Sequence, residues 1–249
     1  MQYKAHRHTL NKPMQLSLCL VVLALSLGSV LLGSRLFMAS LNQYRASSFL
    51  SDWEGKRQVP TDLAWQVAEQ AMHNASSWYP TKHGAYAEQL GYMLQWRVYG
   101  ATPEQADSKD YQQQAIQEFR SASQLRPTWP YAWSGLAYAK LVANEFDQEF
   151  THAMQQAVYY GPNRIGINRR IAEVGLISWD KLNTELRELT LEQASRTARY
   201  SGNSRADLFA LAAEIQRVEL LCEHLQDGIK PCVTESATST APLPSISSK

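Results

Sequence analysis

Two cysteines near the C-terminus form the one pair of residues whose spacing suggests covalent chemistry. Cys222 and Cys232 enclose the segment EHLQDGIKP, in which Asp-Gly and Lys-Pro allow the chain to turn back. In an oxidising compartment this pair could close a disulfide loop worth about 3 kcal/mol on the loop-entropy relation. The alternative is two unpaired thiols in a reducing cytoplasm, because spacing alone does not establish a bridge.

No other reactive side chains have the spacing of a catalytic or metal-binding set. The histidines are scattered, and the chain has no phosphate loop and no GxSxG, GxGxxG or CxxC motif. Glu145, Asp147 and Glu149 are like charges close together, a pattern typical of a solvated helix face. We therefore predict a protein that is not an enzyme and that uses no metal and no cofactor.

The distribution of charge argues against nucleic acid as a partner. The formal net charge is +1, but residues 1–35 carry Lys4, Arg7, Lys12 and Arg35 and no acid. The remainder has 20 basic against 23 acidic residues, a net charge of −3. A mildly acidic body without a basic stripe lacks the clustered Lys and Arg that phosphate binding needs.

An uncharged apolar run predicts a single membrane-spanning helix over residues 16–38, preceded by a basic segment, residues 1–15. The run LSLCLVVLALSLGSVLLGS begins at Leu16, and about 20 such residues cross the ~30 Å hydrocarbon core. A cleaved signal peptide is the alternative, but it needs small residues at −3 and −1 of the cut. Cleavage after Ala39 or Ser34 would place Phe37 or Leu32 at −3, which favours an uncleaved anchor.

The flanking charges predict the orientation of this span. Three basic side chains precede it, against Arg35 and Arg45 just after it, so the N-terminus is expected in the cytoplasm and the body on the far side. Small residues within the span could allow a close helix contact and a homo-oligomer, or could be ordinary small residues of a span. They are Gly28, Ser29, Gly33 and Ser34.

Beyond an expected amphipathic stalk, residues 39–59, one spacing recurs three times. A small or apolar residue is followed four positions later by a large apolar residue. Ala follows three positions after the large residue, and Pro follows five positions after Ala. The three sets are Ala68, Met72, Ala75 and Pro80; Ala115, Phe119, Ala122 and Pro127; and Phe150, Met154, Ala157 and Pro162. Positions four and seven apart share one helix face, and proline ends the helix, so the sequence predicts stacked helical repeats.

This spacing resembles the second helix of a tetratricopeptide repeat. The first helix of such a repeat carries Trp, Leu and a small residue, as Trp133, Leu136 and Ala137 do. After Pro80 two registers stay open, one of which places Leu90 and Gly91 at the last two positions. The resemblance covers residues 60–178 and implies an all-α fold in which the transmembrane helix is followed by a tetratricopeptide-like α-α superhelix.

The C-terminal part lacks the repeat pattern. Residues 179–200 and 204–225 have helical periodicity, so residues 179–232 are expected to cap the stack. Residues 233–249 are rich in Ser, Thr and Pro, which predicts a disordered tail.

In this repeat class the first helices line a concave groove, which is the expected binding surface for a peptide. Tyr supplies contact area and a hydrogen-bonding end, although Tyr at helical spacing also occurs in inter-repeat cores. The candidate groove residues are Tyr92, Gln95, Tyr131, Ser134, Tyr138, Leu141, Arg169 and Glu173.

The whole layout, a basic start, one span, a stalk and a repeat body with the motif WPYAW, resembles the VpsP-type proteins of bacterial exopolysaccharide gene clusters. The resemblance implies a non-catalytic inner-membrane scaffold with a periplasmic body, which assists exopolysaccharide biosynthesis or export through contacts with other polysaccharide-assembly proteins. Two alternatives stay open. One is an envelope assembly or secretion factor, of pilus or cytochrome-maturation type, that binds a polypeptide in its groove. The other is a module that binds polysaccharide directly.

Overall fold

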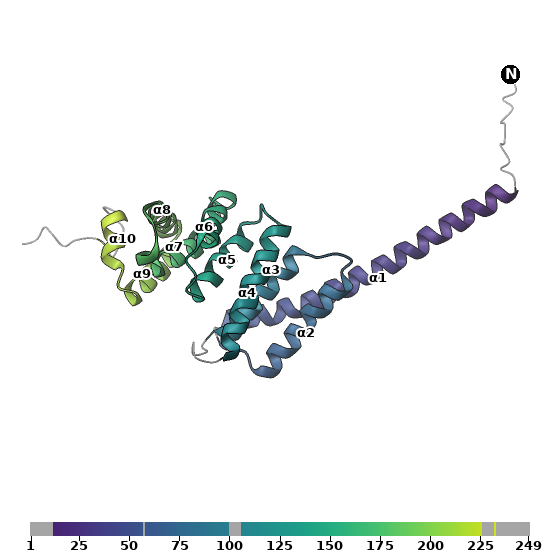
Figure 1. Cartoon of the computed structure of the whole chain (residues 1–249), viewed down its shortest axis with the longest axis horizontal. Helices are drawn as coiled ribbons and strands as arrows, with labels where there is room; N and C mark the ends of the chain where they lie inside the picture. The colour runs from purple at the N-terminus through teal and green to yellow at the C-terminus, as the bar shows by residue number, and fades with distance from the viewer. Residues whose placement is uncertain (1–11, 57, 100–105, 226–231, 233–249) are drawn as a thin grey trace, which may run out of the picture. The chain divides into compact units, whose positions relative to one another are not determined.

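The computed structural model describes residues 12–56, 58–99, 106–225 and 232. These residues contain helices and no β-strand, which confirms the predicted all-α class (Figure 1). The predicted tail, residues 233–249, and residues 1–11 of the predicted basic segment lie outside the described residues. In chain order the elements are α1 (Lys12–Lys56), α2 (Asp62–Trp78), α3 (Gly84–Val98), α4 (Ala106–Leu125), α5 (Pro130–Val142), α6 (Gln148–Tyr160), α7 (Ile165–Ile177), the 3-10 turn η1 (Trp179–Lys181), α8 (Thr184–Tyr200), α9 (Gly202–Glu214) and α10 (Val218–Leu225).

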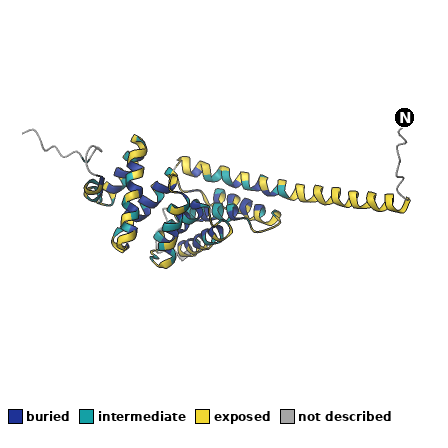
Figure 2. Cartoon of the chain, turned by 90° about the horizontal axis from the view of Figure 1, so that it is seen from above, coloured by how far each residue is buried: buried dark blue, intermediate teal, exposed yellow. Residues whose placement is uncertain are grey.

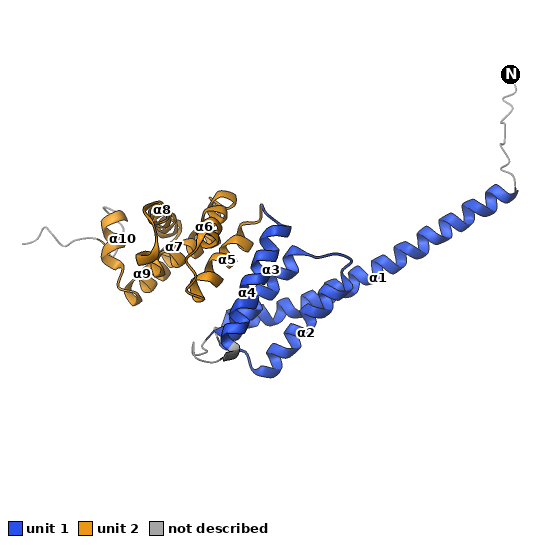
Figure 3. Cartoon of the chain, viewed as in Figure 1, with its two compact units in different colours: residues 1–127 blue, residues 128–249 orange. Residues whose placement is uncertain are grey.

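Consecutive helices pack as hairpins: α1 with α2, α3 with α4, α5 with α6, and α7 with α8, while α9 and α10 pack against α8 and each other. The chain divides into two compact units, which Figure 3 colours separately. Residues 1–127, here called unit 1, contain α1 to α4. Residues 128–249, here called unit 2, contain α5 to α10.

The predicted small and large packing positions are buried within these hairpins. The buried members are Ala68, Met72 and Ala75 on α2; Ala115, Phe119 and Ala122 on α4; Leu136 on α5; and Phe150, Met154 and Ala157 on α6. A Cβ atom on Gly91 would lie 2.9 Å from Phe119 Cε2 and Cζ, so only glycine lets the Phe119 ring pack against α3. Gly91 is therefore the small position of this hairpin, which selects the register that places Leu90 and Gly91 together.

The three predicted prolines each stand two residues beyond the end of a helix. Pro80 follows α2, Pro127 follows α4 and Pro162 follows α6, and all three are exposed. Proline has no amide hydrogen and disfavours the α conformation of the residue before it, so each helix ends at this point. The half-buried Trp133 of α5 packs edge-on to His152, with ring centroids 5.3 Å apart.

Residues 39–56 of the predicted stalk do not stand free of the body, which corrects the expectation from sequence. α1 is one continuous helix from Lys12 to Lys56, and its second half packs along α2. Ala39, Ala46 and Trp53 are buried in that contact. Ala39 and Ala46 are small and two helical turns apart, which lets α2 approach closely, so this half of α1 is the first helix of the first hairpin.

The first half of α1 has the opposite character. Its apolar side chains, including Leu16, Val30 and Phe37, are exposed, and Figure 2 shows the change to buried residues where α1 meets the rest of unit 1. Among the described residues α1 is the one helix long and apolar enough to cross a membrane, a test that a signal sequence near the N-terminus passes as well.

The C-terminal boundary at residue 179 also differs from expectation. α8 pairs with α7 and completes a fourth hairpin, so residues 179–200 belong to the repeated arrangement and not to a separate cap. The expected helix over residues 204–225 is broken into α9 and α10. Gln216 adopts a φ of 58°, and this left-handed residue reverses the chain between them.

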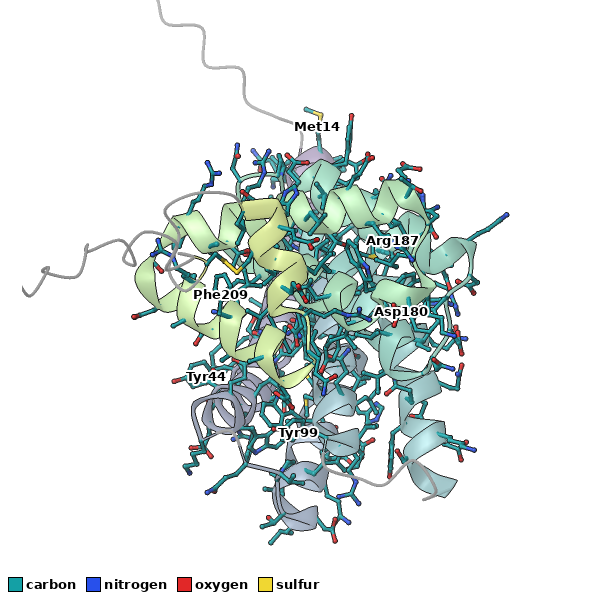
Figure 4. The ribbon with its side chains drawn as sticks, turned by 90° about the vertical axis from the view of Figure 1, so that its left-hand side faces the viewer. Met14, Tyr44, Tyr99, Asp180, Arg187 and Phe209 are labelled. Atoms are coloured by element: carbon teal, nitrogen blue, oxygen red, sulfur yellow. A yellow bond between two sulfur atoms is a disulfide. The ribbon has the colours of Figure 1, made fainter. Side chains whose placement is uncertain are left out.

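The cysteine pair lies at the C-terminal end of unit 2. Cys222 on α10 and Cys232 are joined by a disulfide with an S–S distance of 2.01 Å. Both residues pack against a core that includes Leu221 and Phe209. Figure 4 labels Phe209. The disulfide therefore ties the end of the described chain to the last helices.

Removing this disulfide is expected to destabilise unit 2. Because the bridge closes a loop with a sequence separation of 10, the combined change Cys222→Ser and Cys232→Ser should lower the free energy of unfolding by about 3 kcal/mol. Denaturant unfolding of the full chain in detergent micelles measures this. Reductant should shift the parent protein to the same midpoint and leave the double variant unchanged. Equal midpoints for parent and variant without reductant would mean that the bridge does not stabilise the fold.

Candidate functional site: the tyrosine–arginine surface of unit 2

Two of the predicted groove tyrosines lie on one face of α5, next to α7. Tyr131 and Tyr138 are seven residues apart, which is two helical turns, so their side chains lie along the same face. α7 packs directly against α5. α5 and α7 therefore lie side by side, with α6 between them in the chain.

At the start of α5, Tyr131 is packed between an aromatic ring and an arginine. The Tyr131 and Trp129 ring centroids are 5.3 Å apart, and Arg164 Cζ lies 6.0 Å from the Tyr131 centroid and 5.5 Å from that of Trp129. Gly166 permits the close approach of α7, since a Cβ there would lie 3.3 Å from Tyr131 Oη. These are cation–π distances, so Arg164 and the two rings hold one another in place.

Two turns further along, Tyr138 carries a second arginine. Arg170 Cζ lies 4.4 Å from the Tyr138 ring centroid, and Arg170 Nη1 donates a hydrogen bond of 3.2 Å to Glu173 Oε2. The structure thus brings together the predicted Tyr138 and Glu173, through an arginine that the sequence analysis did not select. The adjacent Arg169, which was selected, instead forms an exposed ion pair of 3.6 Å with Asp207 of α9.

We define the tyrosine–arginine surface by Tyr131, Tyr138, Arg164, Arg170 and Glu173. A guanidinium stacked on a ring keeps N–H donors in its own plane, so it can still bind a carboxylate or a carbonyl. The phenol groups add apolar area and hydrogen-bonding ends. Such a set suits recognition of an extended polypeptide with acidic side chains, and Leu141 adds a half-buried apolar side chain on the same helix.

Three other predicted groove residues have different surroundings. Ser134 is 3% exposed and its hydroxyl donates to the Tyr131 carbonyl, so the expectation that it lines an open groove is wrong. Tyr92 and Gln95 belong to unit 1. The Tyr92 ring packs edge-on to Phe119 at 5.0 Å inside the α3–α4 hairpin. Gln95 Nε2 is buried and has no hydrogen-bond partner among the described residues.

The acidic group that the sequence suggested to be solvated surrounds a buried lysine. Lys140 is 1% exposed, and its Nζ donates to Glu145 Oε2 at 3.0 Å, Asp147 Oδ2 at 2.9 Å and Glu149 Oε2 at 2.9 Å. Asn144, with a φ of 58°, turns the chain after α5, and the Glu145 amide donates to the Lys140 carbonyl at 2.9 Å. This left-handed turn places all three carboxylates over one ammonium.

Electrostatics bind this cluster tightly. Burial alone would lower the pKa of Lys140, but the hydrogen bonds to the three carboxylates outweigh it and raise that pKa above the usual lysine range. Burial raises the pKa of Asp147, but the hydrogen bonds from the Phe150 amide and from Lys140 outweigh it, so that pKa lies below its ordinary value. Because the lysine engages all three carboxylates, the cluster serves to close the α5–α6 hairpin.

Unit 1 has a pocket of about 240 Å³ that sequence reasoning did not find. It lies among α2, α3 and α4, where Leu90 and Leu94 line it together with Glu69, His73 and Glu118. Burial raises the pKa of Glu118, and electrostatic interactions with His73 and Lys82 partly offset this rise. Residues on three separate helices form the pocket, so no local sequence pattern could have indicated it.

Within the described part of the chain, no group of three or more His, Cys, Asp or Glu side chains could hold a metal ion. A scan of the chain against models of protein families, a search of curated proteins and a search of solved structures each gave no match.

Proposed function

We propose that this chain is a membrane-anchored, non-catalytic helical-repeat scaffold whose tyrosine–arginine surface binds a partner polypeptide. The observation that carries the proposal is the continuity of α1. Its first half exposes apolar side chains such as Leu16 and Phe37, whereas Ala39, Ala46 and Trp53 of its second half are buried against α2. One helix thus belongs to the membrane and to the folded body, and it holds that body at a set height above the lipid.

The packing of α1 favours an anchor over a cleaved signal peptide. Cleavage after Ala39 would cut a continuous helix at a residue with no exposed surface. Residues 16–38 extend about 34 Å as a helix, enough to cross the hydrocarbon core of about 30 Å. An uncleaved span also explains why the helix that contains the apolar run continues without a break into the first hairpin.

The body is proposed to be tetratricopeptide-like. Supporting this are the buried Ala–large–Ala faces of α2 and α4, the proline two residues past each of α2, α4 and α6, and the pairing of successive helices into hairpins. Repeats of this type carry partners on their first helices, and α5 and α7, which form the tyrosine–arginine surface, are first helices of their hairpins.

The proposed topology places the N-terminus in the cytoplasm of a bacterium and the body in the periplasm, with the span in the inner membrane. The basic residues before the span and the disulfide near the C-terminus support it, because disulfides persist in oxidising compartments. A reporter enzyme that is active only outside the cytoplasm, fused after Lys249, is expected to be active. An inactive fusion, with a cytoplasm-active reporter at the same place working, would reverse the topology.

The process that we propose is exopolysaccharide assembly or export. Its support is the layout of basic start, single span and repeat body with WPYAW, which resembles the VpsP-type proteins. Crosslinking in the native membrane, followed by mass spectrometry, should then capture polysaccharide-assembly proteins. Capture of pilus, secretion or cytochrome-maturation proteins instead would assign the scaffold to that process and overturn this one.

Loss of the two surface tyrosines is expected to abolish that capture. With Tyr131→Ala and Tyr138→Ala combined, Arg170 loses the ring on which it stacks and Arg164 keeps only Trp129, so partner yield should fall at least tenfold, equivalent to about 1.4 kcal/mol. The matched control is Tyr200→Ala, an exposed tyrosine at the end of α8 that is not part of the tyrosine–arginine surface. Equal yields from the double variant and the control, at equal helix content, would remove the binding role of this surface.

A further inference from the structure

We propose that the turn between α2 and α3, residues 78–82, lies in the headgroup region of the membrane that α1 crosses. Unit 1 then rests directly on the lipid surface. This inference rests on the proposed function, because it takes α1 to be a membrane anchor, and it adds a second site of contact with the bilayer. The proposed occupant of the exposed turn is a lipid headgroup layer.

One hydrogen bond sets the level of the turn relative to the span. Arg35 Nε donates to the Trp78 carbonyl at 3.3 Å. Arg35 is the first charged residue after the apolar run that begins at Leu16, so it marks the height at which α1 leaves the hydrocarbon. α2 returns along α1 and ends at Trp78, and Figure 1 shows the α2–α3 turn beside α1. The end of α2 therefore lies at the membrane surface.

The side chains of the turn have the chemistry of an interface. Trp78 is 42% exposed, and Pro80, Thr81 and Lys82 are exposed beside it. Trp is enriched at membrane–water boundaries because its ring is apolar and its indole N–H is polar. Lys82 and Arg35 add positive charge, and residues 78–82 contain no acid, which suits anionic headgroups.

A second exposed apolar residue lies at the same end of unit 1. A Cβ atom on Gly84, the first residue of α3, would lie 3.1 Å from Leu125 Cβ at the end of α4. Leu125 is exposed, so the membrane-proximal end of unit 1 carries apolar side chains from α2 and from α4. Continuity with the span and the basic charge favour lipid over a second copy of the chain as the occupant.

Nitroxide labels at three depths test the proposal in the full chain. In a Cys19→Ser background, with the Cys222–Cys232 bridge intact, the changes Leu25→Cys, Thr81→Cys and Glu54→Cys are made one at a time. Each labelled protein is placed in vesicles of phosphatidylcholine and phosphatidylglycerol. Power saturation then compares label accessibility to oxygen, which partitions into lipid, with accessibility to a nickel chelate, which stays in water. Circular dichroism checks that helix content is unchanged.

The oxygen-to-chelate accessibility ratio is expected to be highest for the label at Leu25, intermediate at Thr81 and lowest at Glu54. Glu54 is the matched control, since it is exposed on α1 about 28 Å along the helix from Arg35 and so must face water. A Thr81 label with the same ratio as the Glu54 label would overturn the proposal. A Thr81 label shielded from both reagents would show a protein contact and overturn it too. A Leu25 label that matches Glu54 would refute the anchor itself, and with it the proposed function.

Discussion

Replacing Gly175 with alanine is expected to lower the free energy of unfolding of unit 2 by about 3 kcal/mol or more. Gly175 lies on α7 and faces Thr190 of α8. A Cβ atom there would overlap Thr190 Oγ1 and Cγ2 and would lie 2.7 Å from Thr190 Cβ. Thr190 has no exposed surface, and its hydroxyl already donates to the Leu186 carbonyl at 2.7 Å, so α7 and α8 would have to separate. Denaturant unfolding followed by tryptophan fluorescence measures the loss.

A compensating variant distinguishes this packing cause from a general effect of removing glycine. Adding Thr190→Gly to Gly175→Ala removes all three atoms in the way and should recover part of the lost stability, less the cost of glycine in α8. The control is Gly202→Ala at the start of α9, where no atom lies within 4 Å of the added Cβ. The free energy of unfolding of this control should change by less than about 0.5 kcal/mol. If Gly175→Ala behaved like this control, the α7–α8 packing described above would be wrong.

Replacing Lys140 with methionine is expected to lower the free energy of unfolding by about 2 to 3 kcal/mol. The change keeps the apolar stem and removes the ammonium that Glu145, Asp147 and Glu149 share, so three like charges remain close together. Removing one partner of a buried ion pair costs about 3 to 5 kcal/mol of stability. The expected loss is smaller here because the three carboxylates are partly exposed and screened by solvent. The exposed pair Lys56–Asp52, at 2.8 Å, supplies the control: Lys56→Met should cost less than about 1 kcal/mol.

The effect of this lysine should depend on pH on both sides of neutrality. The pKa of Asp147 is lowered on folding, so its contribution is present above the ordinary value of about 3.9 and is lost as pH falls through the lowered pKa. The pKa of Lys140 is raised, so its contribution is complete below about 10.4 and declines as pH rises through the raised value. The stability difference between parent and Lys140→Met should be largest between these limits. A difference that stayed constant from acid to alkaline pH would contradict an electrostatic role.

Local patterns in the sequence were sufficient for the helix faces and their ends. Ala75, Ala122 and Ala157 are buried because residues four and seven apart must share a face, a property of the helix itself. Pro80 and Pro162 follow helix ends because proline cannot continue the hydrogen-bonded ladder. The apolar run in α1 is equally visible, since it depends on composition alone.

Local patterns did not show which helices pack against each other. Ala39 and Ala46 show that a helix can approach, but nothing near them in the chain specifies α2 as the neighbour. Arg170 and Tyr138 are on different helices, so their stacking depends on how α5 and α7 pack. The acidic residues after α5 were predicted to be solvated, but the left-handed turn at Asn144 folds them onto Lys140. That turn has no clear signal in a single sequence.

The sequence by itself determined that this protein is helical and which residues face inward on most helices. It also determined that one segment near the N-terminus is apolar enough to cross a membrane. These properties follow from composition and from a period of 3.6 residues. Only the tertiary structure decided that α1 is part of the first hairpin, that α8 completes the fourth, and that arginines stack on the α5 tyrosines. Those outcomes depend on contacts between residues distant in the chain, whose free energy exists only when both partners are in place.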